Sequence, residues 1–162
     1  MSNQLRECVE SLPGAVIIIG MGNRDRADDG VGLELAQRLK KKYPNHVFSE
    51  EDKSVEGIVF EQMERKDVET ILFIDATDFG GNPGDVKCFK AEDAQKFVPS
   101  FSTHKVPITL LMEVVEQHNK KPLLLGIQPE SLDFFGSMSP SMMKTLHGLE
   151  EAFLRFFNEQ YT

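Results

Sequence analysis

The sequence has few cysteines, no excess of basic residues and no hydrophobic run long enough to cross a bilayer. Among its 162 residues are two cysteines, Cys8 and Cys88, without Cys-x-x-Cys spacing, so we expect two reduced thiols and no zinc site. The 18 basic and 26 acidic residues give a net charge of -8, which argues against nucleic acid as the partner. Residues 1–12 lack the apolar core of a secretory signal or membrane anchor. These absences predict a cytoplasmic protein that does not engage membranes.

The length of the chain fits one compact domain over residues 1–162, in which residues 1–13 form an N-terminal helical extension. Apolar or alternating runs predict strands, and periodic apolar positions predict helices between them. The predicted strands cover residues 15–19, 46–49, 70–74, 85–90 and 123–127, and the helices cover 31–43, 55–66, 91–97, 107–119 and the segment from 139 onward. This alternation predicts an α/β three-layer sandwich, in which a twisted, mostly parallel five-stranded sheet has helices on both faces.

The loop Gly20–Gly32 joins the first predicted strand to its helix and contains two adjacent carboxylates, Asp28 and Asp29. Its glycines permit backbone turns and close approaches that a side chain would prevent. Ligand sites of α/β sheets lie at the carboxyl ends of strands. The loop is therefore the first candidate site.

Three further polar loops follow strands or precede helices in the predicted fold. They contain Asp75 to Asp78, Ser102 to His104, and Gln128 to Glu130. Two nearby carboxylates repel, and a metal ion between them relieves the repulsion. Two carboxylates and one imidazole, from Asp29, Asp75 and His104, would suit nickel, zinc, manganese or iron. The loops therefore indicate a metal-contacting site.

Structural roles for the same residues remain open at this stage. Asp28 and Asp29 would also serve as caps of the following helix, Asp75 as a buried acid bonded to loop amides, and His104 as a surface residue. The Gly20-x-Gly22 pattern resembles a dinucleotide fingerprint, but Asp25 occupies the third glycine position and would repel a pyrophosphate. A nicotinamide cofactor is therefore not expected.

Taken together, the motifs resemble those of the nickel-iron hydrogenase maturation endopeptidases, especially the branch that serves the hydrogenase of formate hydrogenlyase. The matching motifs are Gly20-Met21-Gly22-Asn23, Asp28-Asp29-Gly30-Val31-Gly32, Asp75-Ala76-Thr77-Asp78 with Asn82-Pro83-Gly84, Thr103-His104, and Leu125-Gly126-Ile127-Gln128-Pro129. The resemblance covers about residues 15–157, and the order and spacing of the motifs make it specific.

The resemblance implies an endopeptidase that removes the C-terminal extension of a hydrogenase large-subunit precursor already loaded with nickel. It places the nickel contacts at Asp29, Asp75 and His104, and the catalytic carboxylates at Asp29 and Asp75. The nickel belongs to the precursor and is not a resident cofactor of the enzyme. The expected partner is that precursor, and the enzyme itself is expected to be a monomer.

The sequence departs from the family pattern after the second predicted strand. Relatives commonly have Asp-Gly-Gly and a small hydroxyl residue there, whereas this chain has Glu51-Asp52-Lys53-Ser54. Glu51 could replace the acid, but residues 52 and 53 do not adopt positive φ cheaply. This departure leaves two alternatives open: a nickel-binding or precursor-binding maturation factor without catalysis, and a metal-dependent hydrolase of another substrate.

Overall fold

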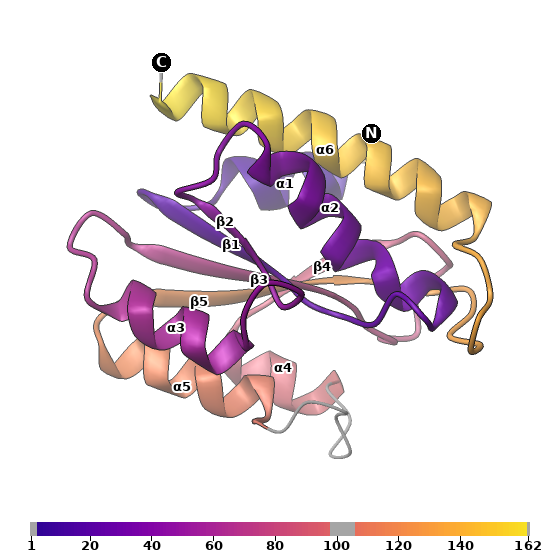
Figure 1. Ribbon diagram of the computed structural model, residues 1–162, viewed down its shortest axis with the longest axis horizontal. Coiled ribbons are helices and arrows are strands. Elements are labelled where there is room, and N and C mark those ends of the chain that lie inside the picture. Colours follow the sequence, from indigo (N-terminus) through magenta and orange to yellow (C-terminus); the bar gives the residue numbers. More distant parts are fainter. Residues whose placement is uncertain (1–2, 98–105, 162) are drawn as a thin grey trace.

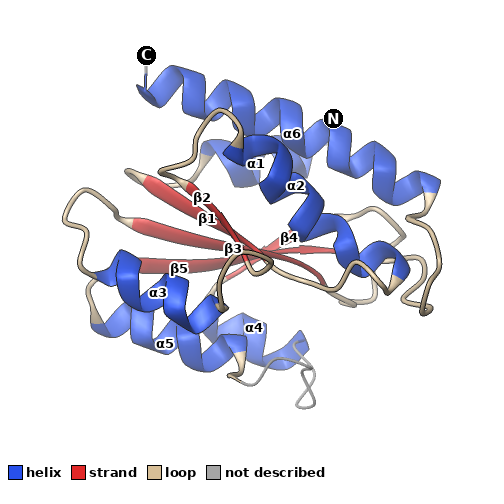
Figure 2. Ribbon diagram, viewed as in Figure 1, coloured by secondary structure: helices blue, strands red, loops and turns tan. Residues whose placement is uncertain are grey.

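The computed structural model describes residues 3–97 and 106–161, in which a five-stranded sheet lies between two layers of helices (Figures 1 and 2). The strands are β1 (Val16–Gly20), β2 (Val47–Ser49), β3 (Thr70–Ala76), β4 (Val86–Phe89) and β5 (Lys121–Ile127), in the spatial order β2-β1-β3-β5-β4. All neighbouring pairs are parallel except β4 with β5, which is antiparallel. The predicted α/β fold with a mostly parallel five-stranded sheet is confirmed.

The helices form two layers that cover opposite faces of the sheet. Figure 2 shows one layer with α1 (Asn3–Glu10), α2 (Val31–Lys40) and α6 (Pro140–Tyr161), and the other with α3 (Val55–Met63), α4 (Ala91–Phe97) and α5 (Ile108–Gln117). A short 3-10 helix, η1 (Ala27–Gly30), precedes α2. No helix in the described ranges is long and apolar enough to cross a bilayer.

Each layer encloses its own hydrophobic cluster, and β1 contributes to both. Val16 and Ile18 lie in the cluster under α1, α2 and α6, whereas Ile17 and Ile19 lie in the cluster under α3, α4 and α5. Successive residues of a strand point to opposite faces, so a strand covered on both sides is apolar throughout. This double burial explains the unbroken apolar run of the first predicted strand.

The strand β4 lies at the edge of the sheet, as its alternating sequence predicts. Val86 and Phe89 are buried and Lys87 is exposed, and the described part of the sheet pairs β4 with β5 alone.

Ser139 precedes α6, and its hydroxyl oxygen accepts a hydrogen bond from the Met142 N–H at 3.3 Å. The Ser139 side chain thus caps the N-terminus of α6.

The two cysteines are joined, which corrects the expectation of reduced thiols. The structure bonds the sulfur atoms of Cys8 and Cys88, with a Cα–Cα distance of 6.3 Å. The two positions are 80 residues apart, and they meet because α1 packs against β4. No short-range spacing could indicate this pairing, because it depends on the placement of a helix across the edge of the sheet.

Candidate active site

The carboxyl ends of four parallel strands lie along one edge of the sheet, and polar residues follow each of them. Asp75 is the penultimate residue of β3 and pairs in register with Gly126 of β5. Phe73 and Ile71, two and four residues earlier respectively, belong to the cluster under α3 and α5. Since side chains alternate along a strand, Asp75 projects on that same face of the sheet. One of its carboxylate oxygens, Oδ1, is buried.

Gly22 is the point at which the loops of Asp29 and Asp75 meet. A methyl group placed on Gly22 would lie 1.9 Å from the backbone oxygen of Asp29 and 3.6 Å from Asp75 Oδ1. Gly22 also has a φ of +139°, which favours glycine. The Asn23 N–H donates to the Asp29 backbone oxygen at 3.1 Å and closes the loop. The glycine-rich motif therefore brings the Asp29 segment against the carboxylate of Asp75.

Gly32 allows the start of α2 to press against the ends of two strands. A methyl group there would lie 2.4 Å from the Ile74 carbonyl oxygen and 2.5 Å from that of Met21. The Met21 N–H in turn donates to the Ile74 oxygen at 2.9 Å. The loop that carries Asp29 is consequently fixed to β3 by backbone contacts as well as by the helix that follows it.

Asp28 has a structural role that distinguishes it from Asp29. The side chain is fully buried, and its two oxygens accept hydrogen bonds from the N–H groups of Glu130 (2.8 Å), Ser131 (3.3 Å) and Ser139 (2.7 Å), and from the Ser139 hydroxyl (2.8 Å). The N-cap residues of η1 and α2, Arg26 and Gly30, make no side-chain capping hydrogen bond. Asp28 therefore anchors the loop between β5 and α6, and the helix-cap alternative is wrong for Asp28.

Asp78 and Gln128 connect the loops after β3 and β5. Asp78 Oδ1 accepts from the Gly80 N–H and from Gln128 Nε2, each at 3.1 Å. The Gln128 side-chain oxygen accepts from the N–H groups of Phe79 and Gly81 at 2.9 and 3.1 Å. The side chains of Asp78 and Gln128 thus fix the conformation of the loop after β3 and tie it to the loop after β5.

Arg24 forms several side-chain hydrogen bonds on the exposed side of the loop Gly20–Gly32. Its Nε atom donates to both carboxylate oxygens of Glu51 at 2.9 Å, and its terminal nitrogens donate to Glu34 (2.8 Å) and Gln37 (2.7 Å). The hydrogen bond from Arg24, reinforced by one from Arg38, lowers the pKa of Glu34 below its ordinary value. Glu51 is therefore engaged in an ion pair on the surface of the protein.

Glu50, rather than Glu51, is the acid that directly follows β2. Its backbone N–H donates to the Gly20 carbonyl at 3.0 Å and continues the ladder between β2 and β1. Phe48, two residues earlier, packs in the cluster under α3 and α5, so Glu50 follows it on the face to which Asp75 projects. Its Oε2 atom is buried. The structure thus places a second acid, Glu50, beside Glu51 after β2, and the interpretation that Glu51 replaces the family acid stays a prediction.

The third predicted metal contact, His104, lies outside the described residues, as do Ser102 and Thr103. In chain order this segment joins α4 to α5, the helices that cover the face to which Asp75 projects. Within residues 3–97 and 106–161, no three His, Cys, Asp or Glu side chains are placed to hold a metal ion. The predicted triad therefore remains a prediction, of which the structure describes Asp29 and Asp75.

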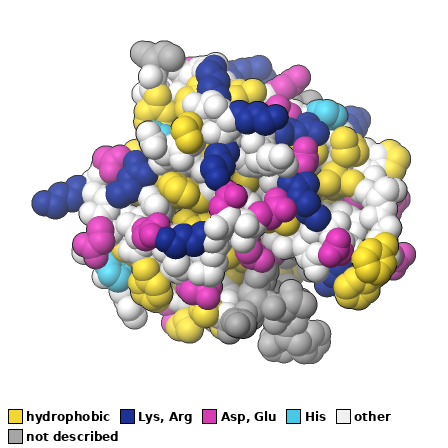
Figure 3. Space-filling model, viewed as in Figure 1, with side chains coloured by type: hydrophobic (Ala, Val, Ile, Leu, Met, Phe, Trp, Pro, Cys, Tyr) yellow, Lys and Arg dark blue, Asp and Glu magenta, His cyan; other side chains and the backbone are white. Residues whose placement is uncertain are grey.

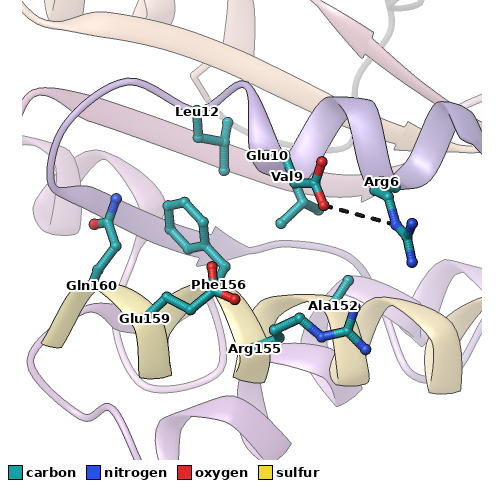
Figure 4. Close-up of a pocket in the computed structure, with 9 residues that line it drawn as sticks. All are labelled: Arg6, Val9, Glu10, Leu12, Ala152, Arg155, Phe156, Glu159 and Gln160. Atoms are coloured by element: carbon teal, nitrogen blue, oxygen red, sulfur yellow. Dashed lines mark ion pairs between the residues drawn. The ribbon is translucent and has the colours of Figure 1, made fainter. Parts of the chain in front are cut away.

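A separate pocket of about 280 Å³ lies between α1 and α6 (Figure 4). Its lining includes an ion pair between Arg6 and Glu10 at 3.8 Å and the side chains of Leu12 and Phe156. Of the predicted site residues that the structure describes, neither Asp29 nor Asp75 lines it. Figure 3 shows acidic side chains interspersed with basic ones over the visible face, without a continuous basic stripe. Neither feature competes with the edge of the sheet as the candidate site.

The fold and the acidic edge define an α/β protein whose site is built from loops at the carboxyl ends of parallel strands. The family model for HycI, hydrogenase maturation protease, matches residues 58–156, which is more than half of the chain. The chain therefore belongs to the hydrogenase maturation protease family. The family and the endopeptidase class predicted from the sequence are both confirmed.

Individual relatives agree with this assignment. The hydrogenase 3 maturation protease of Escherichia coli K12 is 28% identical over 125 residues, which are 76% of this chain and 78% of the relative. The hydrogenase expression/formation protein HoxM of Azotobacter vinelandii is 28% identical over 153 residues, with 90% and 73% covered. The [NiFe] hydrogenase maturation protease HycI of Thermococcus kodakarensis KOD1 has a similar structure, with a TM-score of 0.76, 25% identity, and 94% and 97% covered.

Proposed function

We propose that this protein removes the C-terminal extension of a nickel-loaded hydrogenase large-subunit precursor. The observation that carries the proposal is the junction at Gly22, where the Asp29 loop meets the Asp75 carboxylate at the carboxyl edge of the sheet. Membership of the hydrogenase maturation protease family supports the same activity. In this proposal Asp29, Asp75 and His104 contact the nickel that the precursor carries, and the metal is part of the substrate.

The proposed reaction adds water across one peptide bond of the precursor. Asp29 or Asp75 accepts a proton from the attacking water, and that proton then passes to the nitrogen of the leaving peptide. The C–N bond breaks, which leaves a new C-terminal carboxylate on the large subunit and a free amine on the extension. A carboxylate held against fixed backbone is suited to this role, because a small displacement from the reacting atoms costs much of the rate.

Nickel in the precursor would act as a recognition element. The protease supplies oxygen ligands from Asp29 and Asp75 and a nitrogen ligand from His104 to coordination positions that the precursor leaves open. A precursor without nickel lacks this contact, so its peptide bond is not placed beside the carboxylates. We therefore propose that cleavage follows metal loading.

The test compares nickel-loaded and nickel-free precursor, each incubated with the purified protein and measured by intact mass spectrometry. We expect the mass of the extension to be lost from the loaded precursor alone. Equal cleavage of both precursors would contradict nickel recognition. A stable complex with the loaded precursor without any loss of mass would instead identify a binding factor and refute the protease function.

We further propose that Glu50 contributes to the site as its third acid, and that Glu51 does not. Glu50→Gln is expected to reduce the rate of cleavage about tenfold, because it removes a charge next to Gly20 at the same edge. Glu51→Gln is the matched control and should leave the rate within about twofold, since an exposed ion pair contributes about 0–1 kcal/mol. Single-turnover cleavage rates decide the matter, and a larger effect at residue 51 than at residue 50 would reverse the assignment.

A further inference from the structure

Two consecutive phenylalanines in the loop between β5 and α6 are the most exposed large hydrophobic side chains in the described part of the chain. Phe134 is 67% exposed and Phe135 is 87% exposed, whereas the next, Phe60, is 58% exposed on α3. The two rings lie 6.3 Å apart between centroids. Adjacent exposed aromatic rings form an apolar surface of the kind that marks an interaction site.

Hydrogen bonds to the loop Gly20–Gly32 hold the backbone of the two phenylalanines in place. The Phe135 N–H donates to the Asp25 carbonyl oxygen at 2.6 Å, and the buried Asp28 carboxylate holds both Glu130 and Ser139 on either side of the pair. Phe135 also has a φ of +61°, a strained conformation for a bulky side chain. The rings are therefore presented by a fixed loop, so little backbone freedom remains to be lost on binding.

Arg26 adds a positive charge to this surface. Its guanidinium carbon lies 5.1 Å from the centroid of the Phe134 ring. Its Nε atom is buried without a hydrogen-bond acceptor, and Arg26 makes no ion pair with any described residue. A protein with a net charge of -8 thus places a cation without an ion-pair partner among the described residues beside the exposed ring of Phe134. An apolar side chain next to an acidic group would complement both features.

This surface is continuous with the candidate active site. The Asp29 N–H donates to the Arg26 carbonyl oxygen at 3.0 Å within a single turn of chain. In Figure 1 the orange connection between β5 and α6 passes beside the start of α2, where this turn lies. A segment bound to Arg26 and the phenylalanines would therefore extend directly toward Asp29.

We infer that Arg26, Phe134 and Phe135 form a docking surface for the large-subunit precursor. The docked segment presents an apolar or aromatic side chain beside an acidic group. The inference rests on the proposed function, since it names the surface by which that substrate is held. Docking sets the affinity for the precursor, while Asp29 and Asp75 set the rate of the bound complex.

The test uses the double variant Phe134→Ala/Phe135→Asn, in which asparagine tolerates the positive φ of residue 135. We expect the Kd and KM for nickel-loaded precursor to rise at least tenfold, while kcat stays within about threefold. Phe60→Ala is the matched control, because it removes a similarly exposed ring from α3, and it should change neither constant by more than about twofold. The single variant Phe134→Ala, at a residue without positive φ, repeats the test if the double variant folds poorly.

A charge test accompanies the aromatic one. Arg26→Gln should raise Kd several-fold, and Arg26→Lys should restore part of the loss because it keeps the charge. An unchanged Kd in the double variant, or a fall in kcat without a change in Kd, would overturn the docking surface. If the wild-type protein binds the precursor and does not cleave it, the proposed function fails, while the Kd comparison still decides the docking surface.

Discussion

Asp75→Asn and Asp29→Asn are each expected to reduce the cleavage of nickel-loaded precursor by about 10²–10⁴-fold. Asparagine keeps the shape of the side chain but cannot accept a proton as a carboxylate does, and it is a weaker ligand for a metal cation. The contacts at Gly22 are largely preserved, because the backbone oxygen of Asp29 and the volume of residue 75 do not change. Single-turnover reactions followed by intact mass spectrometry measure the effect.

Asp25→Asn is the matched control for both site variants. Asp25 is an exposed acid in the same loop, and it bonds its neighbours through its backbone N–H and carbonyl groups. Its rate should remain within about twofold of the wild-type rate. Thermal unfolding of all three variants separates loss of catalysis from loss of structure. Retention of more than a tenth of the wild-type rate by either Asp75→Asn or Asp29→Asn would remove that residue from the catalytic role.

Asp28→Ala is expected to destabilise the fold by about 4–6 kcal/mol, because three backbone N–H groups and the Ser139 hydroxyl lose their acceptor in a buried place. A loss of this size is a large part of the total stability of a typical domain, which is about 5–15 kcal/mol. Urea unfolding followed by circular dichroism measures the free energy of unfolding. We expect the loop between β5 and α6 to become more susceptible to proteolysis as well.

Asp28→Asn provides a milder version of the same experiment if the alanine variant does not fold. Its amide oxygen can still accept from part of the loop, so the loss of stability should be smaller than that of Asp28→Ala. Asp25→Ala, at an exposed position, should change the free energy of unfolding by less than about 0.5 kcal/mol. Equal effects at residues 25 and 28 would contradict the role of Asp28 as the anchor of this loop.

The sheet and its helices could be predicted because their signals are local. The apolar run at residues 15–19 becomes β1, which is buried on both faces, and Ser139 caps α6 as its position before Pro140 predicts. The helix expected to reach Tyr43 ends instead at Lys40. The Lys42 and Tyr43 N–H groups both donate to the Leu39 oxygen, so the regular helical pattern gives way to a turn.

The features that could not be predicted depend on distant partners or on one residue of register. The partners of Asp28 lie 102 to 111 positions later in the chain, and no local pattern reports such bonds. Glu50 and Glu51 are the same residue type, so the sequence does not distinguish them. In the structure, Oε2 of Glu50 is buried, whereas Glu51 forms an ion pair with Arg24. The exposure of Phe134 and Phe135 could not be predicted, because exposure of a side chain is a property of the folded molecule.

The bond between Cys8 and Cys88 closes a covalent ring that includes β1, β2 and β3. Asp29, Glu50 and Asp75 lie inside this ring, whereas His104 and the docking surface residues Phe134 and Phe135 lie beyond it along the chain. A single cut of the backbone between residues 8 and 88 would therefore leave two fragments that migrate as one under non-reducing conditions. The three acids that we assign to catalysis thus lie within the segment that the disulfide closes. The residues that we assign to recognition include several in the C-terminal half of the chain, which the disulfide does not enclose.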